Sequence, residues 1–273
     1  MIIDGRALAK EILARTKARV AALPHPPRVL VIAANETTAT KSYLAIKKAR
    51  AADAGCILEI RHIKTSLRPL ELFDMSKEVD AVIVQLPLPE EMDTRAILDN
   101  IPIEKDADVL SSAARTRFES MDIVSPYIVP PVVGAVQKIL ESENIEVKGK
   151  KAVVIGAGFL VGAPMATWLK LQGAEVEVVT LESGIGARAT LAQADIIVSG
   201  AGSPHFIKPD MLKQGVVLID AGASESNGAL AGDADPACAE KCSLFTPVPG
   251  GVGPLAVACL FENIVTLAER IQQ

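Results

Sequence analysis

Short apolar runs alternate with segments of helical periodicity along almost the whole chain, and this alternation constrains the fold more than any other feature. In the first half, runs at 28–34, 57–63 and 79–86 predict strands, and the segments between them at 40–55 and 67–78 predict helices. Strands that alternate with helices usually pair in parallel, with helices on both faces of the sheet. The sequence therefore predicts an α/β fold.

The same alternation restarts in the second half of the chain. A predicted helix at 130–143 leads into it, and an amphipathic helix at 253–273 ends it. Between them we expect the strands KAVVI (151–155), AEVEVVTL (174–181), DIIVSGA (195–201) and VVLIDAGA (216–223), and the helices GAPMATWLKLQG (162–173), ATLAQA (189–194) and KPDMLKQG (208–215). This pattern is typical of a compact nucleotide-binding α/β unit.

The length of 273 residues predicts about two domains. We expect an N-terminal α/β domain over 1–125, which the C-terminal segment 249–273 joins, and a Rossmann-like nucleotide-binding domain over 126–248. We expect the active site in a cleft between the two domains, because ligands bind at the carboxyl ends of parallel strands.

Composition argues against nucleic acid and membranes as partners. The net charge is −5, whereas a protein that binds a phosphate backbone is usually basic. Aromatic residues make up only 3% of the chain, too few for base-stacking platforms. The N-terminal segment MIIDGRALAKEIL is charged and unlike a signal peptide, and no apolar run approaches the roughly 20 residues that cross a bilayer.

The cysteines and histidines point to a reducing compartment and to chemistry without a metal. Cys238 and Cys242 are four residues apart, which is neither a redox nor a zinc spacing, and the four cysteines of the chain are expected to be packed thiols. We therefore expect a cytoplasmic protein without disulfides. The three histidines form no metal-binding pair, so acid–base chemistry is left to lysine, tyrosine and carboxylates.

A glycine-rich turn follows the predicted strand that ends at Ile155. It contains Gly156, Ala157 and Gly158, and Gly162 follows at the start of a predicted helix. Glycines allow the backbone to approach a pyrophosphate, and the helix N-terminus offers free N–H groups to it. The turn predicts a dinucleotide site, and the alternative is a tight strand–helix turn that holds no ligand.

Glu182 follows the next predicted strand, roughly twenty residues beyond the glycines. A carboxylate at this place can accept hydrogen bonds from ribose hydroxyls, which favours NAD over NADP. The alternative is a solvated glutamate in a loop.

Tyr43 and Lys47 are four residues apart on one predicted helix and therefore share a face. A lysine beside a phenol in a half-buried pocket can lose its proton and act as a base. The alternative is an ordinary solvated face, because Lys48 and Arg50 follow on the same helix.

Three further elements carry polar or unusual residues. Gln85 ends a predicted strand, where it can serve a lysine or a substrate, or cap a loop. Asp108 can grip a guanidine-like edge with two parallel hydrogen bonds, or occupy a turn. The Gly- and Pro-rich segment 246–256 either lines a pocket, through Pro249, Gly250 and Gly251, or forms a rigid crossover.

Together these segments resemble the bifunctional methylenetetrahydrofolate dehydrogenase/cyclohydrolase family over nearly the whole chain. The matching segments are IIDGRALA, SYLAIKKA, VQLPLP, KDAD, VVIGAGFLVGAP, ADIIVSGAG, VVLIDAG, GD and TPVPGGVGP, in the family's order and spacing. The resemblance implies oxidation of 5,10-methylenetetrahydrofolate by NAD(P)+ and hydrolysis of the methenyl product to 10-formyltetrahydrofolate.

The resemblance also implies roles for individual residues. Lys47 would assist the addition of water and the proton transfers, Tyr43 would stack near the folate, and Gln85 would hydrogen-bond Lys47. Asp108 would hold the pterin ring, whose adjacent N–H donors suit a carboxylate. The resemblance implies no metal. It implies a homodimer that forms through the nucleotide-binding domain.

The chain departs from the family at several positions. Ala157 and Gly158 stand where the family usually has Arg and Ser, and Glu182 stands near a usual Arg or Lys. Val109 replaces a usual glycine, and Val129-Pro130-Pro131-Val132 replaces Pro-Cys-Thr-Pro. The sequence thus leaves open two alternatives: a divergent paralogue acting on another one-carbon or iminium substrate, and a ligand-binding protein that has lost hydride transfer.

Overall fold

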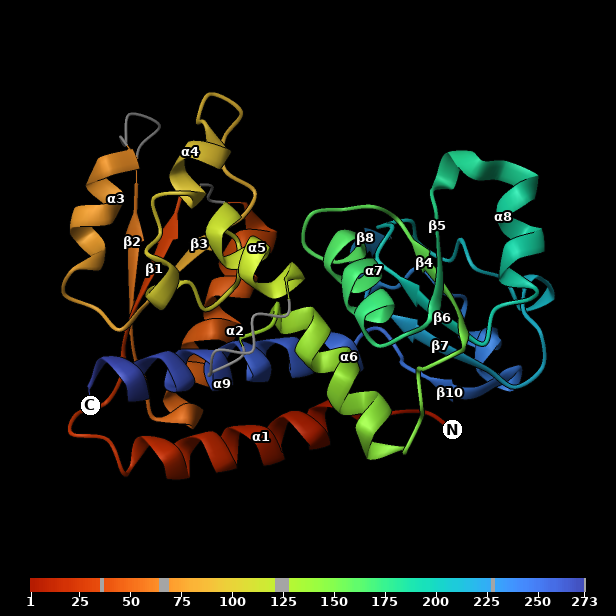
Figure 1. Cartoon of the computed structure of the whole chain (residues 1–273), viewed down its shortest axis with the longest axis horizontal. Coiled ribbons are helices and arrows are strands. Elements are labelled where there is room, and N and C mark those ends of the chain that lie inside the picture. The colour runs from red at the N-terminus through yellow and green to blue at the C-terminus, as the bar shows by residue number, and fades with distance from the viewer. Residues whose placement is uncertain (35–36, 64–68, 121–127, 227–228, 273) are drawn as a thin grey trace. The chain divides into compact units, whose positions relative to one another are not determined.

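The computed structural model describes residues 1–34, 37–63, 69–120, 128–226 and 229–272. It divides into two compact units, which we name by their main sheets. The five-stranded unit comprises Met1–Ala9 and Val132–Ala256, and the three-stranded unit comprises Lys10–Pro131 and Val257–Gln273. Each unit contains its own parallel sheet with helices packed against it (Figure 1).

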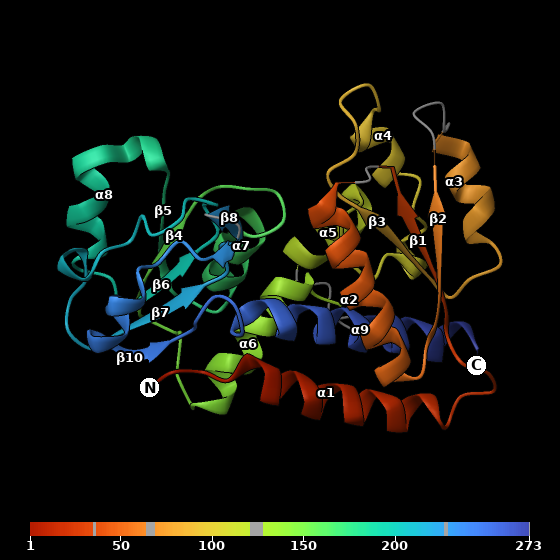
Figure 2. The ribbon, with the colours of Figure 1, turned by 180° about the vertical axis from the view of Figure 1, so that it is seen from behind.

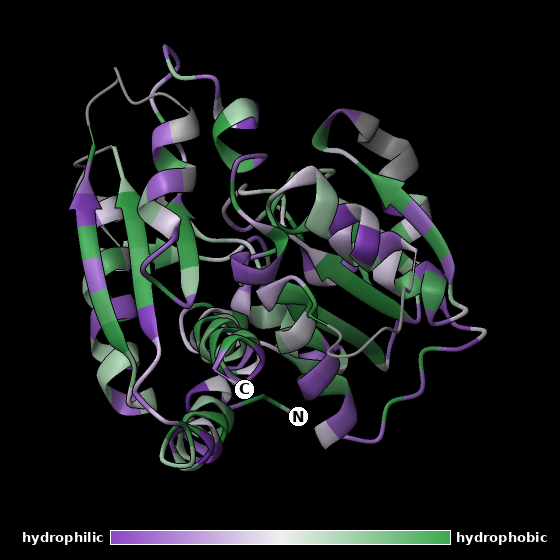
Figure 3. Ribbon diagram, turned by 60° about the vertical axis from the view of Figure 1, so that its left-hand side comes forward, coloured by the Kyte–Doolittle hydropathy of each residue, from purple (hydrophilic) through white to green (hydrophobic). Residues whose placement is uncertain are grey.

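The three-stranded unit is built on a parallel sheet of order β2-β1-β3. Its strands are β1 (Arg28–Ala33), β2 (Ile57–His62) and β3 (Ala81–Gln85). Residues 29–33 of the central strand β1 are at most 1% exposed, whereas β2 at the sheet edge is largely exposed. Figure 3 shows this difference as hydrophilic residues that interrupt the edge strand. Hydrophobic burial on both faces of β1 therefore explains its uninterrupted apolar run.

Helices cover this sheet, and their ends follow capping rules. α2 (Thr38–Ala54) begins after Thr37, whose hydroxyl accepts a hydrogen bond from the Thr40 N–H, and ends at Gly55 with φ of 80°. Figure 2 shows α2 in front of the sheet. The other helical segments of this unit are α3 (Pro69–Ser76), α4 (Thr94–Leu98), η1 (Ile103–Lys105), α5 (Ser112–Glu119), most of α1 (Gly5–Val20) and most of α9 (Val252–Ile271).

α1 and α9 lie side by side in both Figure 1 and Figure 2. Arg19 joins them with a two-pronged ion pair, in which its Nε and a terminal nitrogen lie 2.9 and 2.7 Å from the two Glu269 carboxylate oxygens. α9 is long and apolar enough to cross a membrane by length and composition, contrary to the expectation that no such run exists. Because 61% of its apolar window is buried, it has the character of a core helix.

The five-stranded unit contains a parallel sheet of order β10-β7-β6-β4-β5. Its strands are β4 (Lys151–Ile155), β5 (Glu175–Val179), β6 (Ile196–Ser199), β7 (Val216–Asp220) and β10 (Cys242–Phe245), and β8 (Ser224–Ser226) and β9 (Ala229–Ala231) form an antiparallel pair. The helical segments are α6 (Pro131–Ser142), α7 (Gly162–Leu171), η2 (Leu181–Ser183), α8 (Gly184–Leu191), η3 (Pro209–Met211) and η4 (Pro236–Glu240). The strand order reverses between β4 and β6, which is the switch point where doubly wound sheets bind ligands.

Two features of this unit differ from the pattern expected from the sequence. The segment 208–215 is a single 3-10 turn rather than a helix, because Leu212 is extended and buried and Gly215 has φ of 82°. The first residues of the chain belong here and not to the other unit: the Ile3 N–H donates to the Phe245 carbonyl, and the Phe245 N–H donates to the Met1 carbonyl, both at 2.9 Å. The N-terminus thus extends the sheet beside β10.

Candidate functional site

A hydrogen-bonded polar pair in the three-stranded unit consists of Lys47 and Gln85. α2 carries Lys47, and Gln85 is the last residue of β3. The Lys47 Nζ donates a hydrogen bond of 2.9 Å to the Gln85 side-chain oxygen, while the Gln85 amide nitrogen donates to the Leu86 carbonyl at 2.9 Å. The second bond fixes which way the amide points, so its oxygen faces the amine.

Asp108 is the third member of this group. An isolated parallel bridge between Asp106 and Val82 holds its loop beside β3. Burial raises the pKa of the Asp108 carboxyl, and the neighbouring positive charge of Lys47 opposes that increase. Burial in turn lowers the pKa of the Lys47 ammonium, and the charge of Asp108 opposes that decrease.

This arrangement supports proton transfer. A lysine whose pKa is lowered holds more of its neutral, basic form near neutral pH than an exposed lysine does. The Gln85 oxygen lies within hydrogen-bond distance of either form of the amine, so the amine stays in place when its proton leaves. The chemistry available here is acid–base catalysis with a nearby carboxylate that binds a cationic or N–H-rich partner.

Tyr43 lies one helical turn before Lys47 on α2, and its side chain is 42% exposed. It therefore shares a helix face with Lys47, as its spacing predicts. Its ring is available to an added ligand, and its role stays a prediction.

Asp106 has a structural task beside this site. Its carboxylate is 1% exposed and accepts hydrogen bonds from the N–H groups of Leu110 and Ser111 and from the Ser111 hydroxyl, at 2.7–3.1 Å. These bonds order the turn that follows Asp108. Val109 within this turn has φ of 57°, a conformation that β-branched residues rarely adopt.

Asn263 on α9 is a polar residue that the sequence reasoning missed. Its side chain is 8% exposed and donates hydrogen bonds to the carbonyls of Ala107, at 2.9 Å, and Val129, at 2.8 Å. Ala107 directly precedes Asp108, so Asn263 fixes the backbone that carries the carboxylate. The available signal was an amide within an apolar helix, since a buried polar side chain needs partners.

The glycine-rich turn lies in the five-stranded unit, at the carboxyl end of β4. Gly156 has φ of 90°, and a Cβ on Gly162 would lie 1.9 Å from the Gly156 carbonyl oxygen. Close packing therefore requires these two glycines even without a ligand. Gly158 is different, because a Cβ there would meet nothing within 4 Å. Its backbone is open to an incoming group.

The residues around this turn fit a dinucleotide. Ala157 and Gly158 are exposed, and α7 begins beyond them without a capping hydrogen bond from the side chain of Val161. The pairing of Ile155 with Val179 brings the ends of β4 and β5 together, so that Glu182 follows at the same edge of the sheet with an exposed side chain. Backbone N–H groups and a nearby carboxylate suit a pyrophosphate and a ribose.

The segment containing Pro249, Gly250 and Gly251 also belongs to the five-stranded unit. Gly250 has φ of 115°. A Cβ on Gly5 would lie 1.9 Å from the Gly251 carbonyl oxygen, so two backbones cross here at close range. This crossing accounts for Gly251, and a role of the segment in binding substrate stays a prediction.

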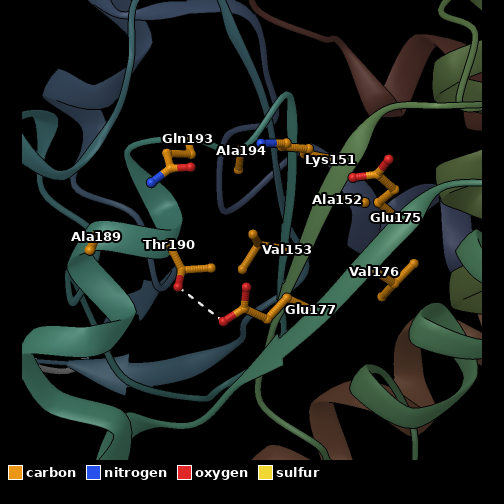
Figure 4. A pocket seen from close by; sticks show the side chains of 10 residues that line it. All are labelled: Lys151, Ala152, Val153, Glu175, Val176, Glu177, Ala189, Thr190, Gln193 and Ala194. Carbon is orange, nitrogen blue, oxygen red and sulfur yellow. Dashed lines mark hydrogen bonds between the residues drawn. The ribbon is translucent and has the colours of Figure 1, made fainter.

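A cavity of about 350 Å³ lies elsewhere in this unit (Figure 4). It is lined by β4, β5 and the segment 189–194, and the Thr190 hydroxyl donates to Glu177 across it at 3.0 Å. None of the predicted site residues lines this cavity. Within the described ranges, no group of three or more His, Cys, Asp or Glu side chains could hold a metal ion.

Two family models match the chain. The catalytic domain of tetrahydrofolate dehydrogenase/cyclohydrolase matches residues 3–108, and the NAD(P)-binding domain of the same family matches residues 130–272. The chain belongs to the tetrahydrofolate dehydrogenase/cyclohydrolase family. The match assigns Lys47, Gln85 and Asp108 to the segment of the catalytic domain, and the glycine turn to the NAD(P)-binding domain.

Relatives from several organisms match nearly the whole chain. The bifunctional protein FolD of Thermotoga petrophila is 34% identical, and the match covers 99% of both chains. The crystal structure of the bifunctional enzyme FolD of Campylobacter jejuni superposes with a TM-score of 0.93 at 30% identity, covering 99% of both chains. The enzyme of Trypanosoma brucei, determined with NADP and an inhibitor, gives a TM-score of 0.91 at 31% identity and covers 99% of this chain and 98% of its own.

Proposed function

We propose that this protein oxidises 5,10-methylenetetrahydrofolate to the methenyl form with a nicotinamide dinucleotide and hydrolyses the product to 10-formyltetrahydrofolate. Family membership over both domains supports the two activities. The observation that carries the proposal is the hydrogen bond between the Lys47 amine and the Gln85 oxygen, with Asp108 coupled to the same amine. It provides a half-buried base beside a carboxylate in the catalytic domain.

Hydrolysis is the step that uses Lys47. Water adds to the methenyl carbon and must lose a proton, and the carbon–nitrogen bond that then breaks needs a proton on the departing nitrogen. The neutral amine of Lys47 accepts the first proton, and its ammonium returns one to the nitrogen. The remaining hydroxyl proton of the adduct is released to solvent as the formyl C=O forms, because a cation and water give a neutral product. Gln85 holds the amine in both states. An ionised Asp108 accepts hydrogen bonds from the adjacent N–H donors of the pterin edge.

The dehydrogenase reaction depends on the other unit. The backbone of Gly156–Gly158 and the first turn of α7 would hold the pyrophosphate, and Glu182 would accept hydrogen bonds from the ribose. A bound nicotinamide supplies the acceptor for the hydride that leaves the methylene carbon. We propose a preference for NAD+, since the exposed Glu182 carboxylate repels a 2′-phosphate and Ala157 and Gly158 offer it no polar side chain.

Substitution of Lys47 by Met tests the proposal. The purified protein is mixed with methylenetetrahydrofolate and NAD+ or NADP+, and methenyl absorbance and NAD(P)H are followed together. We expect Lys47→Met to slow hydrolysis by about 10²–10⁴-fold, the usual contribution of a positioned acid–base group. Reduction of the dinucleotide should fall less, because removal of a hydride moves no proton.

The matched control is Lys48→Met, which removes an exposed ammonium from the next position on α2. It should leave both rates close to those of the unmodified protein. Full hydrolysis by Lys47→Met would contradict the role of Lys47. An unmodified protein without either activity would contradict the proposed function itself.

We also propose that the protein is a cytoplasmic homodimer. β5 lies at the edge of its sheet and carries Val178, which is 41% exposed, and such an edge can pair with a second copy. The four buried free cysteines suit a reducing compartment. Sedimentation equilibrium of the purified chain tests the dimer, and a monomer at micromolar concentration would contradict it.

A further inference from the structure

The five-stranded unit contains two buried carboxylates, which are separate from the group formed by Lys47, Gln85 and Asp108. Asp220 is the last residue of β7 and is 1% exposed, and Asp233 follows β9 and is fully buried. Burying a carboxylate is costly unless hydrogen bonds satisfy it, so each should have specific partners.

Asp233 accepts three hydrogen bonds, all from β6 and the loop that follows it. The Ser199 hydroxyl lies 2.6 Å and the Ala201 N–H nitrogen 2.8 Å from one carboxylate oxygen, and the Ser203 nitrogen lies 2.7 Å from the other. A single side chain therefore holds the backbone of residues 199–203, which we call the β6 loop.

The β6 loop packs against the glycine-rich turn. The Gly200 N–H donates to the carbonyl of Ile155, the last residue of β4, at 2.9 Å. A Cβ on Gly156 would lie 3.0 Å from the Gly200 carbonyl oxygen and 3.1 Å from the Ala201 Cα. The strand order reverses between β4 and β6, so the β6 loop and the glycine turn form the two sides of the switch point.

Two glycines pack directly against these carboxylates and leave no room for a side chain of their own. A Cβ on Gly222 would lie 2.3 Å from the Asp233 carboxyl carbon, and a Cβ on Gly232 would lie 2.2 Å from an Asp220 oxygen. Asp220 accepts from the N–H groups of Gly222 and Ala234, at 2.9 and 2.8 Å. Asp220 thus holds the backbone of Ala234, the residue directly after Asp233.

We infer that Asp233 is a positioning residue of the dinucleotide site, which holds the β6 loop against the glycine turn and so fixes one side of the crevice that receives the cofactor. The inference rests on the proposed function. Asp233 is fully buried, so it acts through the loop and not by touching the reacting atoms.

Asp233→Asn is the direct test. The amide keeps the size of the side chain but replaces one acceptor oxygen by an NH₂ group, which faces N–H or O–H donors. We expect the Kd for NAD+, measured by calorimetry, and the KM for NAD+ to rise about tenfold or more, because charge-assisted bonds to the loop are lost. Exchange of the Ala201 and Ser203 amide hydrogens should accelerate.

Hydrolysis of methenyltetrahydrofolate distinguishes a specific effect on the dinucleotide site from general damage to the protein. Hydrolysis uses Lys47 in the other unit, so a specific effect leaves the rate of hydrolysis and the KM for the folate at the values of the unmodified protein, whereas general damage would change both. The matched control is Asp210→Asn, the same substitution at an exposed side chain of the same unit. It should leave the Kd for NAD+ unchanged.

Four outcomes would contradict either the inference or the proposed function on which it rests. An unchanged Kd for NAD+ in Asp233→Asn overturns the inference, as does a parallel loss of hydrolysis. If Asp233→Asn does not fold, Ser199→Ala decides: a rise of the Kd of about threefold supports the inference, and an unchanged Kd overturns it. An unmodified protein that binds neither NAD+ nor NADP+ would instead contradict the proposed function.

Discussion

Asp220 should make the stability of the five-stranded unit depend on pH. Burial raises the pKa of this carboxyl to about 6, and the neighbouring charge of Asp233 adds to the increase, while a hydrogen bond from the Ala234 N–H opposes it. The folded unit therefore binds the Asp220 proton more tightly than the unfolded chain, where the pKa is the ordinary 3.8. The contribution of this group to the unfolding free energy is complete below about pH 4 and is lost as the pH rises through about 6.

The size of the effect follows from the shift. A difference of about two pKa units corresponds to about 3 kcal/mol, since one unit is equivalent to about 1.4 kcal/mol. Asp220 is only 1% exposed, so water does little to screen the effect. In Asp220→Asn this dependence disappears. The amide cannot accept from both the Gly222 and Ala234 N–H groups, but that cost is independent of pH.

The measurement is the unfolding free energy in urea as a function of pH, for the unmodified protein and for Asp220→Asn. Trp168 is the single tryptophan of the chain and lies on α7 with 4% exposure, so its fluorescence reports the unfolding of this unit. The difference between the two proteins cancels the contribution of each titrating group that does not interact with Asp220. It should shift by about 3 kcal/mol in favour of the variant between about pH 4 and pH 8.

Glu146→Gln, which removes an exposed carboxylate of the same unit, controls for the loss of one negative charge. Its stability should run parallel to that of the unmodified protein. A difference between Asp220→Asn and the unmodified protein that stays constant with pH would refute the raised pKa. If the stability difference instead shifted in favour of the unmodified protein as the pH rises, the pKa of Asp220 would be lowered in the folded unit and not raised.

Two further predictions concern the cofactor and the catalytic loop. Glu182→Arg should raise the ratio of kcat/KM for NADP+ over NAD+ by about tenfold to hundredfold, because it replaces a repulsive contact with the 2′-phosphate by an attractive one, and each pair of unit charges in contact is worth about 1 kcal/mol in water. Glu146→Arg should leave the ratio unchanged. An unaltered ratio in Glu182→Arg would contradict the role of Glu182. Asn263→Ala leaves two carbonyls without their donor and should destabilise the three-stranded unit by about 2 kcal/mol. The value of kcat/KM for the folate should fall, while the Kd for NAD+, measured by calorimetry, should stay unchanged. Unchanged folate kinetics would show that Asn263 does not position Asp108.

The sequence was sufficient where a local pattern carries the information. Apolar runs with a period or composition typical of strands predicted β1, β3 and β4 to within two residues at each end, because burial on both faces of a parallel sheet demands such runs. The glycines that close the turn after β4 were equally visible, since Gly156 and Gly162 must pack without side chains. The resemblance to the family predicted in addition the hydrogen bond between Lys47 and Gln85.

Local pattern failed where distant segments decide the conformation. The segment 208–215 has helical composition, but Leu212 is drawn into the core and ends the helix after one 3-10 turn. The pairing of the first residues with β10 depends on a strand some 240 positions away in the sequence, and short β10 itself escaped notice.

The sequence alone predicted which residues could do chemistry, and the tertiary structure decided which of them lie close together. Lys47 reaches Gln85 because α2 covers the sheet in which β1 aligns Ala33 with Gln85 at the carboxyl edge. Asn263 supports Asp108, and Asp233 holds the β6 loop, through hydrogen bonds whose partners lie 156 and about 30 positions away in the sequence. Such bonds leave no periodic trace in a sequence, because they depend on where packing places two backbones rather than on the neighbours along the chain.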